Sequence, residues 1–198
     1  MVVIAGKNKL LVCFLLITSI FTVFSGCGKK HLPESTEHKI IAIRLAEGHP
    51  PGYPTTEGVM EFARLVDERS QGLIKIVVYH SSQLGEEKTV IEKIKQGNLE
   101  MARVNVAPLA AADKQLGFLS LPYLFDSDEH LWTFLDGQPG TRILDGLYAY
   151  NIKGLTYYES GVRSFYSAVP IRTVNDLRGM NIRVQQNQIN ADMIKALG

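Results

Sequence analysis

Two short apolar segments on either side of one amphipathic helix pattern most constrain what this chain can fold into. Residues 39–45 and 73–79 are rich in β-branched side chains, and the second segment is apolar at almost every position. Between them, apolar residues recur on one helix face, at Val59, Phe62 and Val66. A strand, a helix and a strand in about forty residues form a βαβ unit, which requires a parallel pair. A strand that is apolar on both sides predicts helices over both faces of the sheet.

The rest of the sequence continues this alternation, which predicts an α/β fold. Further strands are predicted at 99–106, 152–159, 162–168 and 180–184. Further helices are predicted after Gly85, from Asp126 or Ser127 through Phe134, from about 141 to 150, and from 187 to 197. We expect Thr55 or Thr56 to cap the first helix, Gly72 to end it and Gly97 to end the second. Within 99–106, alternation places Arg103 and Asn105 on one face.

Composition narrows the class of protein. The chain has 198 residues, of which 45% are apolar and 21% charged, so it is not a largely disordered chain. It carries 21 basic and 20 acidic side chains, a balance that gives no support for nucleic acid as a partner. Two cysteines, Cys13 and Cys27, cannot make a dense disulfide framework or a four-cysteine zinc site.

The first 26 residues are typical of an export signal. Lys7 and Lys9 precede an apolar run at 10–24, as in a secretory signal peptide. The run is shorter than the roughly 20 residues that span a bilayer, although a transmembrane anchor is the alternative. The run ends in Phe-Ser-Gly-Cys, which resembles a bacterial lipobox with Phe24 in place of the usual Leu. We therefore predict a lipoprotein signal peptide at 1–26, lipidation of Cys27 and a polar tether at 27–37; the alternative for Cys27 is a free thiol.

No motif of a known enzyme chemistry is found in the sequence. It lacks G-x-S-x-G, H-E-x-x-H, G-x-x-x-x-G-K and G-x-G-x-x-G, and its five histidines have no metal-ligand spacing. The acidic residues follow helix faces, where solvation accounts for them. We therefore expect no metal, no cofactor and no catalytic residue.

Two arginines are the exception to this ordinary pattern. Arg183 lies inside a predicted strand, on the face opposite Ile182 and Val184. Arg163 lies in Gly161-Val162-Arg163, just beyond a glycine break. Guanidinium groups in such positions suit a carboxylate ligand, which accepts two parallel hydrogen bonds from each. The alternative is an internal ion pair or an edge strand facing water.

An ordered set of short motifs extends over most of the chain beyond residue 37. The set comprises Gly-His-Pro-Pro at 48–51, Ser-Gln-Leu-Gly-Glu at 82–86, Gly-Asn-Leu-Glu-Met at 97–101, Leu-Pro-Tyr-Leu-Phe at 121–125, Glu-Ser-Gly-Val-Arg at 159–163 and Asp-Leu-Arg-Gly-Met-Asn-Ile-Arg-Val at 176–184. With its two arginines twenty positions apart, the set resembles the solute-binding proteins of TRAP transporters, the tripartite ATP-independent carriers of organic acids.

This resemblance implies a two-lobed, type II periplasmic-binding-protein fold with an incomplete second lobe. Residues 38–160 would form the first lobe and 161–198 the start of the second. The resemblance also implies that Arg183 makes the main salt bridge to the ligand carboxylate, assisted by Arg163. His49 and Asn105 would line the other side of the cleft. For His49 loop packing is the alternative, and for Asn105 capping of the sheet end.

By the same resemblance, the protein binds its ligand without catalysis. It would capture an organic acid, such as a C4-dicarboxylate, keto acid or sugar acid, and deliver it to an ion-gradient-driven membrane permease. Its place would be periplasmic or otherwise extracytoplasmic, with a lipid anchor at Cys27. The alternatives are a ligand-sensing subunit of a signalling receptor, or an α/β enzyme with a site around His80 or His130. Members of the family are longer, so we expect the chain to be a fragment that stops in the first helix of the second lobe.

Overall fold

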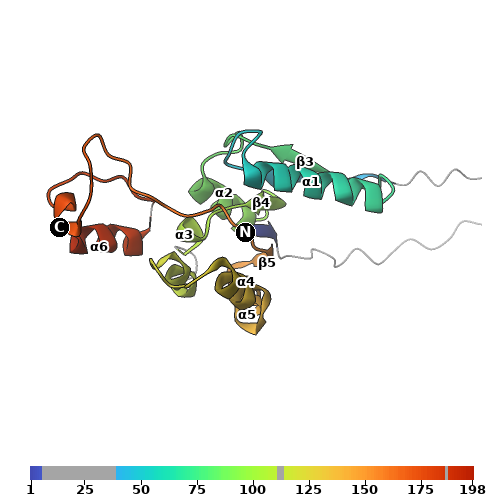
Figure 1. Cartoon of the computed structure of the whole chain (residues 1–198). Helices are drawn as coiled ribbons and strands as arrows, with labels where there is room; N and C mark the ends of the chain where they lie inside the picture. The colour runs from blue at the N-terminus through green and yellow to red at the C-terminus, as the bar shows by residue number, and fades with distance from the viewer. Residues whose placement is uncertain (6–38, 111–113, 186) are drawn as a thin grey trace, which may run out of the picture.

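The computed structural model describes residues 1–5, 39–110, 114–185 and 187–198 (Figure 1). Its strands are β1 (Val2–Ala5), β2 (Ile41–Ala46), β3 (Ile74–Tyr79), β4 (Met101–Arg103) and β5 (Ile152–Thr156). Its α-helices are α1 (Pro54–Arg69), α2 (Glu87–Lys95), α3 (Val106–Leu109), α4 (Asp128–Asp136), α5 (Gln138–Gly146) and α6 (Gln188–Ala196). Three 3₁₀ helices, η1 (Lys114–Ser120), η2 (Leu147–Tyr150) and η3 (Val174–Leu177), complete the described elements. The predicted tether and Cys27 lie outside the described residues.

The strands form one five-stranded sheet in the order β3-β2-β4-β1-β5. β2 pairs in parallel with β3 and with β4, so the predicted parallel βαβ unit is confirmed. β1 is antiparallel to both of its neighbours, β4 and β5. The carboxyl ends of β2 and β4 therefore meet at the same edge of the sheet, where Ala46 is the register partner of Ala102.

The two faces of the sheet are buried under different helices. On one face, residues of β1, β2 and β4 cluster with the apolar side of α2: Val3, Ala46, Ala102, Val90, Ile91 and Ile94. On the other face, the neighbouring strand residues cluster with α1: Val2, Leu45, Met101, Val59 and Phe62. Because side chains alternate along a strand, two buried faces need apolar residues at consecutive positions. Coverage of both faces is confirmed for the inner strands β2, β4 and β1, whereas β3, from which it was predicted, has one exposed face.

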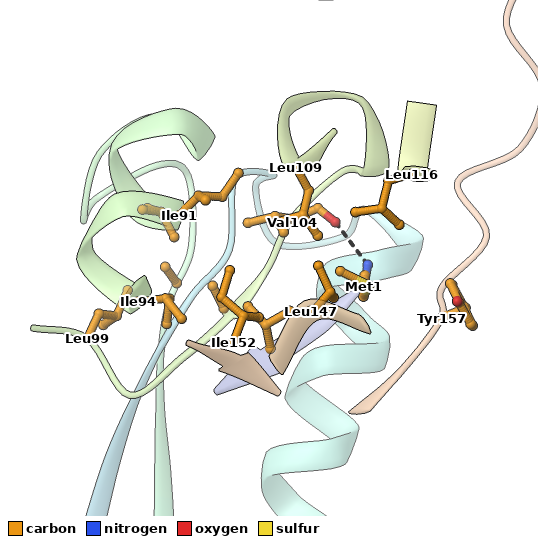
Figure 2. Close-up of a cluster of buried hydrophobic side chains, with 14 residues drawn as sticks. Met1, Ile91, Ile94, Leu99, Val104, Leu109, Leu116, Leu147, Ile152 and Tyr157 are labelled. Carbon is orange, nitrogen blue, oxygen red and sulfur yellow. Dashed lines mark hydrogen bonds between the residues drawn. The ribbon is translucent and has the colours of Figure 1, made fainter. Parts of the chain in front are cut away.

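The first residues of the chain occupy an interior position in the sheet (Figure 2). Met1 is 3% exposed, and its α-amino group donates to the Val104 carbonyl over 2.9 Å. The Val104 N–H in turn donates to the Met1 carbonyl, also over 2.9 Å. Burial, and secondarily the Arg103 charge, lower the pKa of this amino group to about 5, so it is neutral at pH 7.

β1 belongs to the segment that the sequence predicts to be a removable leader. Cleavage before Cys27 would take β1 away, and β4 and β5 would each lose the strand that lies between them. Unpaired backbone groups in the middle of a sheet are costly. The uncleaved chain is therefore the form to which this sheet order applies.

The helix ends follow local chemistry, with one correction. Pro54 occupies the first turn of α1 and Tyr53 is its N-cap, so the expectation of a Thr55 or Thr56 cap is wrong. The reason is that Pro is favoured at the first helical position, which starts the helix earlier. Gly72 and Gly97 follow α1 and α2 at φ 80° and 73°, as left-handed helix-ending residues do. Ser127 caps α4 by accepting from the His130 N–H at 3.1 Å, as one of the two predicted caps.

The strands predicted at 162–168 and 180–184 are wrong. The chain beyond β5 has no strand among its described residues, and Figure 1 shows it running as an extended segment toward α6. Val162 is 92% exposed and Tyr166 is 96% exposed. β-branched and aromatic residues form a strand only where a neighbouring strand accepts their backbone hydrogen bonds, and this segment has no such neighbour in the described chain.

Placing a charge at the centre of β1 tests its position in the sheet. Val3 is fully buried, so Val3→Asp should lower the free energy of unfolding by about 3 kcal/mol or more. Val77 in β3 is 44% exposed, so Val77→Asp is the matched control and should cost much less. Urea unfolding monitored by circular dichroism measures both. Equal losses for the two variants would mean that β1 does not lie inside the sheet.

The buried amino group predicts a pH dependence of stability. Its pKa is about 5 in the folded chain against 8.0 as the ordinary value. Between pH 5 and pH 8 the amino group is therefore protonated more in the unfolded chain than in the folded chain. The free energy of unfolding should fall as the pH drops from 8 to 5. The loss is at most about 4 kcal/mol and levels off below pH 5. Urea midpoints across this range measure it.

The matched control is the same chain with an acetylated α-amino group, which cannot titrate. Its stability should lack this part of the slope, while any contribution of the histidines remains in both samples. Identical pH profiles for the two chains would contradict a buried, titrating amino group.

Candidate functional site

A buried ion pair lies where β2 and β4 end. Glu47 is the first residue after β2, and Arg103 is the last residue of β4. The parallel register that aligns Ala46 with Ala102 brings these two side chains together at the carboxyl edge of the sheet. Their side chains are 0% and 1% exposed, respectively. In open α/β sheets this edge is where ligands bind.

The pair has the two-pronged geometry of a guanidinium on a carboxylate. Arg103 donates through Nε to Glu47 Oε2 over 2.6 Å and through Nη2 to Glu47 Oε1. Glu47 Oε1 also accepts from the His49 N–H over 2.8 Å. The pair therefore joins two strands and fixes the start of the loop that carries His49.

Asn105 and Glu87 extend the pair into a four-residue network, which we call the edge cluster: Glu47, Glu87, Arg103 and Asn105. Arg103 Nη1 donates to Asn105 Oδ1 over 3.3 Å, and Glu87 Oε1 lies 3.8 Å from the same Nη1. The Asn105 backbone N–H donates to Glu87 Oε1 over 2.7 Å, and its Nδ2 donates to Glu87 Oε2 over 3.2 Å. Because both amide atoms of Asn105 have partners of the right kind, its orientation is fixed.

A shallow pocket with a volume of about 10 Å³, the space of one water molecule, borders the edge cluster. It lies between the ends of β2 and β4 and the N-terminus of α2, and its lining residues are Ala46, Glu47, Gly48, Gly85, Glu87, Val90, Arg103 and Val104. The Glu87 side chain is 20% exposed, so it connects the buried pair with solvent. Three of the lining residues are charged, and two of these are acidic.

His49 lies on the loop above the ion pair and stacks on Tyr53, with ring centroids 4.0 Å apart. Burial and then the nearby Arg103 charge lower the pKa of His49, which favours the neutral ring. The stacked ring matches the loop-packing alternative, while the Glu47 contact ties His49 to the edge cluster.

Arg163 and Arg183 lie elsewhere, on the extended segment beyond β5, and both are exposed. Among the described residues no hydrogen bond or ion pair joins either guanidinium to a carboxylate, or joins the two to the edge cluster. Their role as carboxylate ligands stays a prediction. The described residues also contain no group of three His, Cys, Asp or Glu arranged to hold a metal ion.

Sequence reasoning missed the centre of the site. It assigned the acidic residues to solvated helix faces, which is wrong for the fully buried Glu47. It placed Arg103 and Asn105 on one strand face, and the hydrogen bond between them agrees. The signal that could have found the pair was one charged residue, Glu47, two positions after the predicted strand 39–45, and another, Arg103, inside the predicted strand 99–106.

The buried pair should contribute far more stability than an exposed pair on the same two segments. Arg103→Ala leaves the buried Glu47 carboxylate without its cationic partner, and should lower the free energy of unfolding by about 3–5 kcal/mol. Arg44 makes a similar two-pronged contact with Glu100, but their side chains are 47% and 41% exposed. Arg44→Ala is therefore the matched control, with a small loss. Chemical unfolding of both variants measures the difference, and equal losses would contradict the burial of the pair.

Comparisons with known proteins agree with one another. The family described as bacterial extracellular solute-binding protein, family 7, matches residues 45–198. A solute-binding protein of Chromohalobacter salexigens is 34% identical over 151 residues, which are 76% of this chain and 45% of the relative. The C4-dicarboxylate-binding protein DctB of Bacillus subtilis is 31% identical over 155 residues, which are 78% of this chain and 43% of the relative.

Solved structures give the same result. A TRAP periplasmic solute-binding protein from Xanthobacter autotrophicus with bound β-D-galacturonate has a TM-score of 0.76 and 39% identity, covering 79% of this chain and 52% of that one. The sugar acid binding protein DctPAm from Advenella mimigardefordensis, in complex with galactonate, has a TM-score of 0.78 and 34% identity, covering 81% and 52%.

This chain therefore spans about half the length of the proteins that it matches. The periplasmic-binding-protein-like α/β fold, which the sequence predicts, is confirmed. The chain belongs to family 7 of the bacterial extracellular solute-binding proteins, the solute-binding proteins of TRAP transporters.

Proposed function

We propose that this protein captures an organic acid outside the cytoplasm and delivers it to the membrane permease of a TRAP transporter. The observation that carries the proposal is the likeness to solute-binding proteins whose structures hold sugar acids, β-D-galacturonate and galactonate among them. The B. subtilis relative is named for C4-dicarboxylates, so the shared chemistry is a carboxylate. The homologues of this chain are binding proteins of transport systems. We therefore propose that this chain binds its ligand without catalysing a reaction.

The ligand carboxylate would bind the two arginines of the segment beyond β5. Arg183 would form the main two-pronged salt bridge and Arg163 would assist it. Support comes from their exposure and from the absence of a competing carboxylate partner among the described residues. Each charge-assisted hydrogen bond contributes about 1.5–3 kcal/mol net, so two such pairs provide substantial affinity.

The edge cluster would meet the rest of the ligand from the first lobe. Residues 38–160 would supply that lobe, and residues 161–198 would begin the second lobe with the two arginines. Closure of the lobes would exclude water and strengthen the Arg–carboxylate attraction. Contacts that exist only in the closed state would shift the hinge equilibrium toward closure, which the permease could recognise.

An extracytoplasmic place follows from the family, and the leader at 1–26 would direct export. None of the described helices has the length and apolar character needed to cross a membrane. We propose attachment of the exported chain to the membrane by a lipid on Cys27, with residues 27–37 as the tether. Mass spectrometry of Cys27 in the exported protein tests this attachment.

Substitution of Arg183 tests the proposed binding mode. Arg183→Ala should weaken D-galacturonate binding by about 2–5 kcal/mol, because the ligand carboxylate loses its two-pronged partner. Arg183→Lys should also bind poorly, since an ammonium cannot form the planar fork. Isothermal titration calorimetry measures both. Arg172, exposed on the same segment, provides the matched control Arg172→Ala, which should bind as the parent does. Unchanged affinity in both Arg183 variants would remove Arg183 from the site.

A further inference from the structure

We propose that the edge cluster makes this protein selective for a hydroxylated monocarboxylate, a sugar acid, over a C4-dicarboxylate. The inference deepens the proposed function and rests on it, because it takes the first carboxylate of the ligand to be held by Arg183. It concerns the part of the ligand that meets the first lobe, where a sugar acid carries hydroxyl groups and a C4-dicarboxylate carries a second carboxylate.

The guanidinium of the edge cluster already donates to protein acceptors. Arg103 gives its Nε and Nη2 donors to the two oxygens of Glu47, and Nη1 to Asn105. The Arg103 and Glu47 side chains are 1% and 0% exposed, so neither turns outward without disrupting the end of the sheet. A second ligand carboxylate would find no free fork of parallel donors here.

The pocket beside the edge cluster carries a net negative charge. Its charged lining residues are Glu47, Glu87 and Arg103, which sum to one excess negative charge. The nearby His49 ring does little to compensate this excess, because burial and the Arg103 charge lower its pKa and so favour the neutral ring. A second carboxylate would therefore approach a like charge in a partly desolvated place.

Glu87 and Asn105 of the edge cluster can form hydrogen bonds with ligand hydroxyl groups. Glu87 is the member of the cluster that reaches solvent, and its carboxylate accepts hydrogen bonds from hydroxyl donors. Asn105 is locked between Arg103 and Glu87, with one amide hydrogen on Nδ2 and one lone pair on Oδ1 beyond its protein contacts. A hydroxyl both donates and accepts, so it can satisfy such groups without bringing a charge. A site built to bind hydroxyls discriminates strongly against ligands that lack them.

Glu87 is therefore the specificity-determining residue that can be altered with least harm to the fold. Glu87→Gln keeps the shape and removes the excess negative charge, whereas changing Glu47 or Arg103 would break the buried pair. Glu92 lies on the same helix, α2, and is exposed, where it pairs with Lys95 over 2.9 Å. Glu92→Gln makes the same charge change away from the pocket and is the matched control.

The experiment compares D-galacturonate with succinate by calorimetry, using the protein and its two variants at pH 7. We expect the parent protein to bind D-galacturonate at least about 100-fold more tightly than succinate. Glu87→Gln should narrow this ratio about tenfold or more, through weaker sugar acid binding and weaker repulsion of succinate. Glu92→Gln should keep the parent ratio. The ratio separates selectivity from a structural role, because loss of folded protein lowers both affinities together.

Each outcome decides a different claim. Equal binding of succinate and D-galacturonate by the parent would overturn the selectivity and leave the proposed function intact. A parent preference that Glu87→Gln does not change would overturn the role of the edge cluster. Failure of the parent to bind either acid would overturn the claim that these 198 residues capture an organic acid, and the selectivity with it.

Discussion

The ion pair between Glu47 and Arg103 connects the fold of this protein to its candidate site. It depends on the parallel register of β2 and β4, which places the residue after one strand beside the last residue of the other. Once buried, the pair cannot lose one partner without leaving an uncompensated charge in a dry place. The His49 loop and the Asn105 side chain are both hydrogen-bonded to it. The geometry of this edge of the sheet is thus tied to the stability of the domain.

The sheet has a second constraint in the strand between β4 and β5. The strand between β4 and β5 is β1, which belongs to the segment predicted to be a leader. Its position in the sheet also buries the α-amino group of the chain. The chain spans about half of its relatives. Removal of the N-terminal segment would therefore act directly on the position between β4 and β5.

Prediction from sequence succeeded where local chemistry decides the structure. The apolar and β-branched character of 73–79 predicts a strand, and β3 is that strand beside β2. Its predicted burial on both faces is wrong, because β3 lies at the sheet edge with Lys75 and Val77 exposed. Glycines at 72 and 97 end helices because their left-handed backbone suits that position. Prediction failed at 162–168 and 180–184, because a strand requires a partner and the described chain offers none there. The same lack of a neighbour leaves Arg163 and Arg183 exposed.

The sequence by itself determined the α/β class, the βαβ unit and, through its ordered motifs, the family. These features depend on residue type and spacing, which act over a few turns of chain. Only the tertiary structure decided that Glu47 is buried rather than solvated, and that Arg103 has its donors committed to Glu47 and Asn105. The reason is that Glu47 and Arg103 are 56 positions apart and meet only through the register of two parallel strands. Charge compensation between such distant residues is a property of the fold, because it requires the two strand ends to be brought together.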